Sequence, residues 1–312
     1  MKRKMLIIAN PGERDAENYC EGVNQDVTRY HRFFTSIQGG AWKTDEIKTL
    51  IRPEPREVDL ALSELKSADY SMVIFCGHGY SRKNGTTMVE LYKDCDYDSN
   101  NFKQGAARHT VILDCCRIVY EPVSESVSNH YELRASADHL AALQHARDVF
   151  DDAVRRCPPG LAVLYACSLD ETAEDNEETG GVYSHALRSA ALRLSETLLG
   201  SETASVVRIH NNAAQAVCHE TGGHQNPTIT KPRSEPYFPF CVSIPPAICI
   251  GKREYFYLHR ISTQPTDYPK PFTHRSFIRT GGNRATLCLP RIFCPVDAPL
   301  FPDAPPRIEP KN

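Results

Sequence analysis

The sequence predicts a three-layer α/β sandwich, in which helices cover both faces of a mostly parallel sheet, followed by a small β-rich extension. Three observations predict this fold class. Uninterrupted apolar runs of five or six residues, such as 71–76 and 110–114, suit strands that are buried on both faces of a parallel sheet. Segments with helical periodicity alternate with these runs, and this alternation is typical of an α/β fold. Near residue 245 the composition becomes rich in proline and basic side chains.

The predicted elements alternate along residues 1–244. The run 5–9 is a first strand that ends at the turn signal Asn10-Pro11-Gly12. Residues 58–65 place apolar side chains at i, i+3, i+4 and i+7, which predicts a helix with one apolar face. The further strands are 71–76, 110–114 and 161–166, and the further helices are 23–34, 143–154 and 182–199. The segments 79–109 and 121–136 fit neither pattern and are long enough to be functional loops.

Composition excludes several classes of protein. Of 312 residues, 41% are hydrophobic and 24% are charged, which is typical of a folded globular chain and excludes bulk disorder. The net charge of −3 argues against a protein that coats nucleic acid. No run approaches the roughly eighteen apolar residues of a membrane span, and the stretch Met5 to Ala9 is too short for the core of a signal peptide. We therefore expect a cytoplasmic protein with no nucleic-acid or membrane partner.

The extension, residues 245–312, differs from the rest of the chain in proline and charge. It contains 12 of the 22 prolines and ten Lys and Arg against five Asp and Glu, a net charge of +5, whereas residues 1–244 carry 26 against 34, a net charge of −8. Strand-like segments lie at 254–261, 274–279 and 285–289, with a hairpin turn at 280–283. The extension either packs on the first domain or senses an anion or nucleotide, because Arg forks hold phosphates and aromatic rings stack on bases.

The cysteines predict neither a disulfide scaffold nor a metal site. There are twelve, about 4% of the chain, and several lie in apolar strand-like runs, so we interpret most of them as reduced core residues. Zinc ligands usually come as close pairs, two to four residues apart. No CxxC occurs here, and Cys288 and Cys294 are six residues apart. The sequence therefore predicts no metal and no cofactor.

Reactive side chains follow three of the predicted strands. The strand ends read Cys-Gly-His-Gly-Tyr-Ser at 76–81, Asp-Cys-Cys-Arg at 114–117 and Cys-Ser-Leu-Asp-Glu-Thr at 167–172. Function collects at the carboxyl ends of strands in open α/β sheets. A thiol and an imidazole can carry out nucleophilic catalysis there, because the imidazole takes the thiol proton and later protonates the leaving group. The pattern alone leaves open the alternative of a buried histidine in a turn and two packed thiols.

The same residues carry a resemblance to a known family. The segments VIFCGHGYS (73–81) and VILDCCR (111–117) resemble the strand ends of caspase and metacaspase peptidases of the C14 type, in which His-Gly closes one strand and Asp-x-Cys the next. The opening strand with GVNQD (22–26), the acidic loop ACSLDETAED (166–175), GGVYSHAL (180–187) and 225–242 resemble further segments of that family in consistent order. The likeness covers about residues 4–244.

The resemblance implies the roles of the reactive residues. It implies that His78 is the general base and acid, that Cys116 is the nucleophile, and that the amides of Gly79 and Cys116 hold the oxyanion. Metacaspase-like motifs place the nucleophile two residues after the aspartate. Alternation along an extended strand also puts Asp114 and Cys116 on one face, with Cys115 pointing into a packed layer.

The resemblance also implies a substrate preference. In metacaspases the aspartate at the position of Asp114 lines a pocket for a basic residue, with help from an acid in the loop of Asp170, which predicts cleavage after Arg or Lys. Glu171, Glu174 and Asp175 compete with Asp170 for that role, and Asp114 could instead cap local backbone amides. The chain lacks the Gln-Ala-Cys-Arg-Gly run of animal caspases and the His-Ser-Gly that follows the metacaspase cysteine.

The leading hypothesis is a regulated cysteine endopeptidase acting on protein or peptide substrates. Bacterial caspase-like proteases of this size often act in antiviral defence, and some respond to nucleotide second messengers made by TIR-domain partners. This resemblance suggests that Arg260, Arg275 and Arg279 of the extension bind a small nucleotide activator. The alternative is a catalytically silent caspase-like scaffold or decoy that binds partner proteins. A small-molecule hydrolase ranks last, because the chain has no G-x-S-x-G elbow.

Overall fold

The computed structural model describes residues 1–16, 18–118, 137–198 and 200–244. By its internal contacts the chain divides into two units, Met1–Leu258 and His259–Asn312, and every described residue belongs to the first. The segment 121–136 and the predicted strands of the extension lie outside the described residues. The boundary near 245 stays a prediction.

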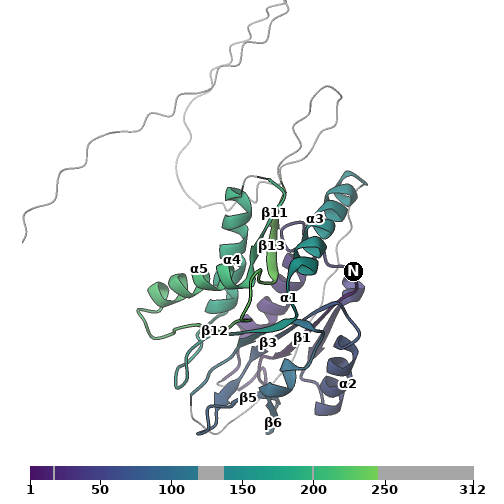
Figure 1. Cartoon of the computed structure of the whole chain (residues 1–312). Coiled ribbons are helices and arrows are strands. Elements are labelled where there is room, and N and C mark those ends of the chain that lie inside the picture. The colour runs from purple at the N-terminus through teal and green to yellow at the C-terminus, as the bar shows by residue number, and fades with distance from the viewer. Residues whose placement is uncertain (17, 119–136, 199, 245–312) are drawn as a thin grey trace, which may run out of the picture. The chain divides into compact units, whose positions relative to one another are not determined.

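A six-stranded sheet forms the centre of the first unit, in the order β12-β8-β7-β3-β1-β2 (Figure 1). Its strands are β1 (Arg3–Asn10), β2 (Ile47–Ile51), β3 (Tyr70–Gly77), β7 (Arg108–Asp114), β8 (Gly160–Tyr165) and β12 (Thr228–Thr230). The first five strands pair in parallel, and β12 pairs with β8 in the antiparallel sense. The prediction of a mostly parallel sheet is confirmed.

Helices cover both faces of this sheet. Successive residues of a strand point to opposite faces, and here both sets of side chains are apolar and buried. On β1, Met5 and Ile7 belong to the core under α1 (Glu21–Thr35), α3 (Ala137–Arg156), α4 (Val182–Thr197) and α5 (Val206–Glu220). Leu6 and Ile8 belong to the core on the other face, under α2 (Pro55–Leu65). The predicted three-layer arrangement is therefore present (Figure 1).

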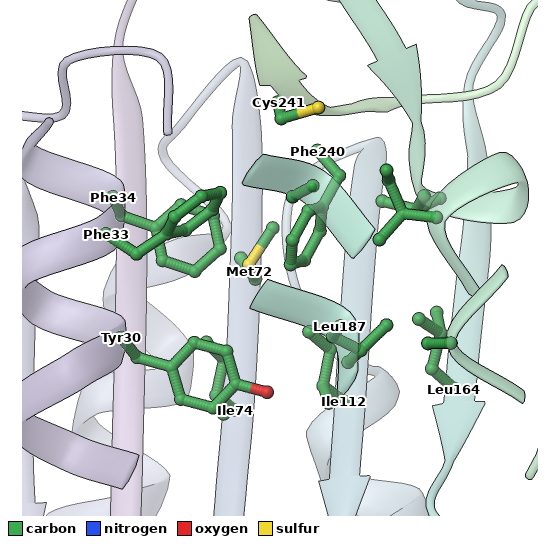
Figure 2. Close-up of a cluster of buried hydrophobic side chains, with 14 of the residues drawn as sticks. Tyr30, Phe33, Phe34, Met72, Ile74, Ile112, Leu164, Leu187, Phe240 and Cys241 are labelled. Atoms are coloured by element: carbon green, nitrogen blue, oxygen red, sulfur yellow. The ribbon is translucent and has the colours of Figure 1, made fainter. Parts of the chain in front are cut away.

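Aromatic rings fill the core on the α1 face (Figure 2). The ring of Phe240 lies 5.5 Å from that of Phe33 and 5.4 Å from that of Phe34, centroid to centroid. Phe240 comes from β13 (Pro239–Ser243), which pairs with β11 (Glu202–Ser205). Aromatic pairs of this kind add about 0.5–1.5 kcal/mol each to the free energy of burial. The last described strand is thus fixed to the first helix.

The segment 79–109 is not the irregular loop that the sequence suggested. It forms a three-stranded antiparallel sheet, with β4 (Gly79–Ser81), β5 (Thr87–Tyr92) and β6 (Cys95–Asp98), followed by the short helix η2 (Ser99–Lys103). Val89 and Leu91 of β5 are buried in the core of the α2 face. The remaining elements are the short helix η1 (Thr44–Glu46) and a small hairpin of β9 (Asp175–Asn176) and β10 (Gly180–Gly181).

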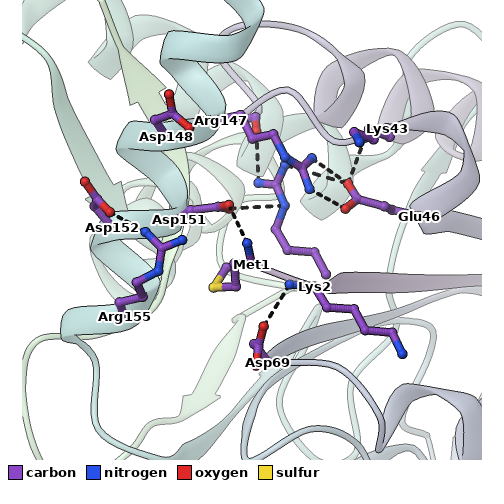
Figure 3. Close-up of polar contacts among 12 residues, drawn as sticks. Met1, Lys2, Lys43, Glu46, Asp69, Arg147, Asp148, Asp151, Asp152 and Arg155 are labelled. Atoms are coloured by element: carbon purple, nitrogen blue, oxygen red, sulfur yellow. Dashed lines mark hydrogen bonds and ion pairs between the residues drawn. The ribbon is translucent and has the colours of Figure 1, made fainter.

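A network of charges lies where β1 begins, at the amino end of the sheet (Figure 3). The guanidinium of Arg3 is buried, donates to the carbonyls of Gly40 and Ala41, and forms an ion pair with Asp151 of α3. Burial lowers the pKa of Arg3 to about 10, so it remains charged at neutral pH. This network connects α3 to β1 at the end of the sheet opposite to the reactive strand ends.

Candidate active site

The parallel register brings the two reactive strand ends to the same edge of the sheet. In β3 and β7, Cys76 pairs with Asp114. His78 follows the last residue of β3, and Cys116 is the second residue after β7. The predicted imidazole and the predicted thiol therefore follow adjacent strands at the carboxyl edge of the sheet.

The imidazole of His78 is held from the segment that follows β1. The backbone carbonyl of Asn18 accepts a hydrogen bond from the ring, and Sγ of Cys20 lies 3.8 Å from Nε2. Burial lowers the pKa of His78, although the bond to Asn18 opposes this shift. The ring is therefore neutral at pH 7 and able to accept a proton.

The two adjacent cysteines lie in different environments. Cys115 is 2% exposed and belongs to the core on the α2 face, as the alternation predicted. A side chain at Gly79 would come within 2.8 Å of its Sγ, so only glycine fits at that position. Cys116 is partly exposed, and its Sγ lies 3.4 Å from the amide nitrogen and 3.5 Å from the carbonyl oxygen of Ala173. Of the two thiols, Cys116 is the accessible one.

The thiol of Cys116 is protonated at neutral pH. Burial raises its pKa, the amide of Ala173 opposes this, and the charge of Asp114 adds to the rise. A thiol of this kind needs a neighbouring base before it can attack a carbonyl carbon. The neutral ring of His78 is in the protonation state that such a base requires.

Asp114 precedes the accessible Cys116 by two residues, and its side chain is only 6% exposed. Its Oδ2 accepts a hydrogen bond of 3.0 Å from the amide of Ser184, the third residue of α4. Through this oxygen it caps one backbone amide of α4, the role that the sequence offered as an alternative to lining a pocket, and the pocket role stays a prediction. Burial raises the pKa of Asp114 to about 6.

A second buried carboxylate, Asp26 of α1, lies next to Asp114. A side chain at Gly181 would touch both of them, at 2.6 Å and 3.1 Å. Asp26 accepts from the amide of Gly181 at 2.7 Å and from Nη1 of Arg188 at 2.9 Å. Burial raises the pKa of Asp26 to about 8, and Arg188 opposes this rise. Arg188 also donates to the carbonyl of Thr179, so the ion pair anchors the hairpin β9–β10 to helices α1 and α4.

In the acidic loop, the structure brings Asp175 to this cluster and not Asp170. Oδ2 of Asp175 accepts from the amide of Gly22 at 3.1 Å, and its charge contributes to the raised pKa of Asp114. Asp170 is exposed in a left-handed turn, with φ of 64°. Among the described residues, no bond links its carboxylate to His78, Cys116 or Asp114.

The other acids of the loop face elsewhere. The carboxylate of Glu171 accepts bonds from the amides of Ser168 and Asn226 and from Nδ2 of Asn226, so it fastens the loop. Buried Gln225 connects the carbonyl of Ala166 to the amide of Glu174. The position of the backbone beside Cys116 is thus determined by bonds from the segment 225–226.

Comparison with known proteins identifies the family. The sequence matches the family model of the caspase domain, peptidase C14, over residues 2–238. The chain belongs to the caspase-domain family. No curated protein matches the sequence. The crystal structure of caspase-1 from Spodoptera frugiperda is similar to the chain, with 14% identity, a TM-score of 0.47 and coverage of 78% of this chain and 89% of that one.

Membership of the caspase-domain family implies a cysteine peptidase that hydrolyses protein substrates. No helix in the described part of the chain is long and apolar enough to cross a membrane. Within the same residues, no group of three or more His, Cys, Asp or Glu side chains is arranged to hold a metal ion. The predicted nucleotide-binding arginines, Arg260, Arg275 and Arg279, lie outside the described residues.

Proposed function

We propose that the protein is a cysteine endopeptidase in which Cys116 is the nucleophile and His78 the general base and acid. The observation that carries this proposal is the parallel register of β3 and β7, which brings both residues to one edge two positions beyond the pair of Cys76 and Asp114. The burial of Cys115 and the accessibility of Cys116 support the choice of thiol.

The chemistry follows from the protonation states. The neutral imidazole of His78 accepts the proton of the Cys116 thiol as Sγ attacks the scissile carbonyl carbon. The amide of Gly79, the residue after the base, and the amide of the nucleophile Cys116 would stabilise the oxyanion that forms. The imidazolium then donates its proton to the leaving amine, and a water molecule, deprotonated by the same ring, hydrolyses the thioester. The carbonyl of Asn18 orients the ring throughout, because it accepts a ring proton.

We propose a preference for Arg or Lys at the scissile position, set by Asp114 with Asp175 in place of Asp170. Asp175 is the acid of the loop that lies near Asp114. The carboxylate of Asp26 is paired with Arg188. Asp114 and Asp175 accept hydrogen bonds from the backbone amides of Ser184 and Gly22, and a substrate cation would add its charge to theirs. A guanidinium or ammonium would gain charge-assisted hydrogen bonds there.

The catalytic roles are tested by incubating each variant with a mixture of peptides and identifying the cleaved peptides by mass spectrometry. Cys116→Ala and His78→Ala should abolish peptide cleavage at sites after Arg or Lys, whereas Cys115→Ala, the matched control, should retain substantial cleavage. Circular dichroism should show that each variant folds. Cleavage by Cys116→Ala at the wild-type rate would contradict the assignment of Cys116. A folded wild type that cleaves no peptide, with or without a small nucleotide, would instead favour the scaffold that binds partner proteins without cutting them.

We further propose, on the sequence alone, that the peptidase is a regulated cytoplasmic effector of antiviral defence, switched on by a nucleotide from a TIR-domain partner. The support is the net charge of +5 in residues 245–312 against −8 in the rest. A ligand can shift an inactive-to-active equilibrium only by binding the two states differently. Activity that appears with a small nucleotide and is lost in Arg260→Ala, Arg275→Ala or Arg279→Ala is the expected result. Full activity without any nucleotide would contradict it.

A further inference from the structure

A second thiol lies at the imidazole, and the mechanism above does not use it. Cys20 is the residue that precedes α1, and its amide is bonded to the carbonyl of Pro11 at 2.7 Å. Its Sγ lies 3.8 Å from Nε2 of His78 and 3.6 Å from the carbonyl oxygen of Asn18. The same carbonyl accepts a hydrogen bond from the imidazole. One backbone oxygen, one thiol and one ring therefore meet at this point.

The thiol of Cys20 is a neutral group in this position. Burial raises its pKa to about 12, and the carboxylates of Asp175 and Asp114, together with Cys116 in its ionised form, add to the rise. A neutral S–H is a weak donor and a weak acceptor. It therefore occupies the space beside Nε2 without offering the strong hydrogen bond that a water molecule would offer there.

The weak hydrogen bonding of the Cys20 thiol affects the pKa of His78, the proposed base. The pKa of His78 is lowered because the ring is withdrawn from water. A water molecule at the place of the Cys20 side chain would solvate the imidazolium and raise that pKa. The ring would then be protonated, and unable to act as a base, over a wider range of acid pH.

We propose that Cys20 is a positioning residue of the peptidase, whose thiol packs against Nε2 of His78, shares the Asn18 carbonyl with the ring and keeps the imidazole neutral. This inference rests on the proposed function, since it assigns a role beside the same base. The thiol that lies against Nε2 is that of Cys20, whereas the Sγ of Cys116 contacts the backbone of Ala173.

The titratable groups that raise the pKa of Cys20 are Asp175, Cys116 and Asp114, which come from the acidic loop and from the end of β7. The substitution Cys20→Ala changes none of them. A change in the pH profile of that variant therefore reports the surroundings of the ring. Cys241→Ala is a matched control, because Cys241 is another buried thiol and lies on β13.

The experiment measures kcat/KM against pH, together with the pH dependence of Cys116 alkylation by iodoacetamide, resolved by mass spectrometry of peptides. Cys20→Ala should move the acid limb of both profiles to higher pH by about half a unit or more. It should also lower kcat/KM at pH 6 by roughly threefold or more. Cys241→Ala should give the wild-type acid limb, and a bulkier apolar substitution, Cys20→Val, should keep the limb near its wild-type position by excluding water.

Two different results separate failure of this inference from failure of the proposed function. If the wild type cleaves peptides and Cys20→Ala has the same acid limb, the positioning role is wrong and the catalytic proposal stands. If the wild type cleaves nothing with or without a small nucleotide, and Cys116 alkylates no faster than a buried thiol in both cases, the catalytic proposal itself is wrong and the role of Cys20 falls with it.

Discussion

Replacing Arg188 by methionine should cost the protein a large part of its stability, and more at high pH than at low pH. Arg188 donates to Asp26 at 2.9 Å and to the carbonyl of Thr179 at 3.1 Å. Asp26 is 1% exposed, so the variant leaves a buried carboxylate bonded to the amide of Gly181, without its ion-pair partner. Breaking a buried ion pair by removing one member costs about 3–5 kcal/mol.

The pH dependence of this loss follows from the sign of the pKa shift. The pKa of Asp26 is already raised by burial, and loss of Arg188 raises it further. A carboxyl whose pKa is higher in the folded than in the unfolded state binds more protons when folded, so stability falls as pH rises above the unfolded pKa of about 4. Because the wild-type carboxyl already has a folded pKa of about 8, the two proteins lose stability in parallel up to that pH, and the deficit of Arg188→Met should grow above it. The deficit should therefore be smaller at pH 5 than at pH 8.5.

Urea unfolding followed by circular dichroism at these two pH values measures both effects. The double variant Asp26→Asn, Arg188→Met is the matched control, because it removes the buried charge together with its partner and should be more stable than Arg188→Met alone at pH 8.5. A loss below about 1 kcal/mol at both pH values, within the range of an exposed pair, would refute the reasoning. A larger deficit at pH 5 than at pH 8.5 would refute it as well.

Two further predictions concern pH. Since the pKa of Asp114 is raised to about 6, the preference for Arg over citrulline at the scissile position should weaken as pH falls from 7.5 to 5; a ratio of kcat/KM values that stays constant would contradict a role of Asp114 in the pocket. Burial lowers the pKa of His210, 3% exposed and bonded to Tyr183, to about 4. Stability should therefore be lost as pH falls from about 6.5 to 4, by about 3 kcal/mol. His210→Asn should remove most of this loss in acid unfolding experiments, and an unchanged loss would exclude His210 as its source.

The central strands could be predicted because each is buried on both faces and therefore reads as an unbroken apolar run. β3 and β7 are of this kind. β2 is only partly buried, so its run IKTLI carries a weaker signal. The strands of the segment 79–109 were not predicted, because Glu90 interrupts the apolar run of β5 and its partner strands carry polar side chains.

The candidate site was predictable to the extent that it is local in sequence. His78 and Cys116 follow directly from two strand ends, and a parallel sheet brings such ends together. Asn18 and Cys20 gave no signal of their own, since their position beside His78 depends on how the chain turns after β1. Asp175 was one of four acids in a charged loop, and only its bond to Gly22 of α1 distinguishes it from Asp170.

The most direct test of the catalytic proposal is covalent labelling with a peptide chloromethyl ketone that ends in lysine, with the modified residue located by mass spectrometry. The wild type and Cys115→Ala should each take up one label, on Cys116. Cys116→Ala should take up none, and His78→Ala should react far more slowly than the wild type. Labelling of Cys115 or Cys20 in the wild type, or an unchanged rate in His78→Ala, would contradict the assignment of Cys116 as nucleophile and His78 as its base.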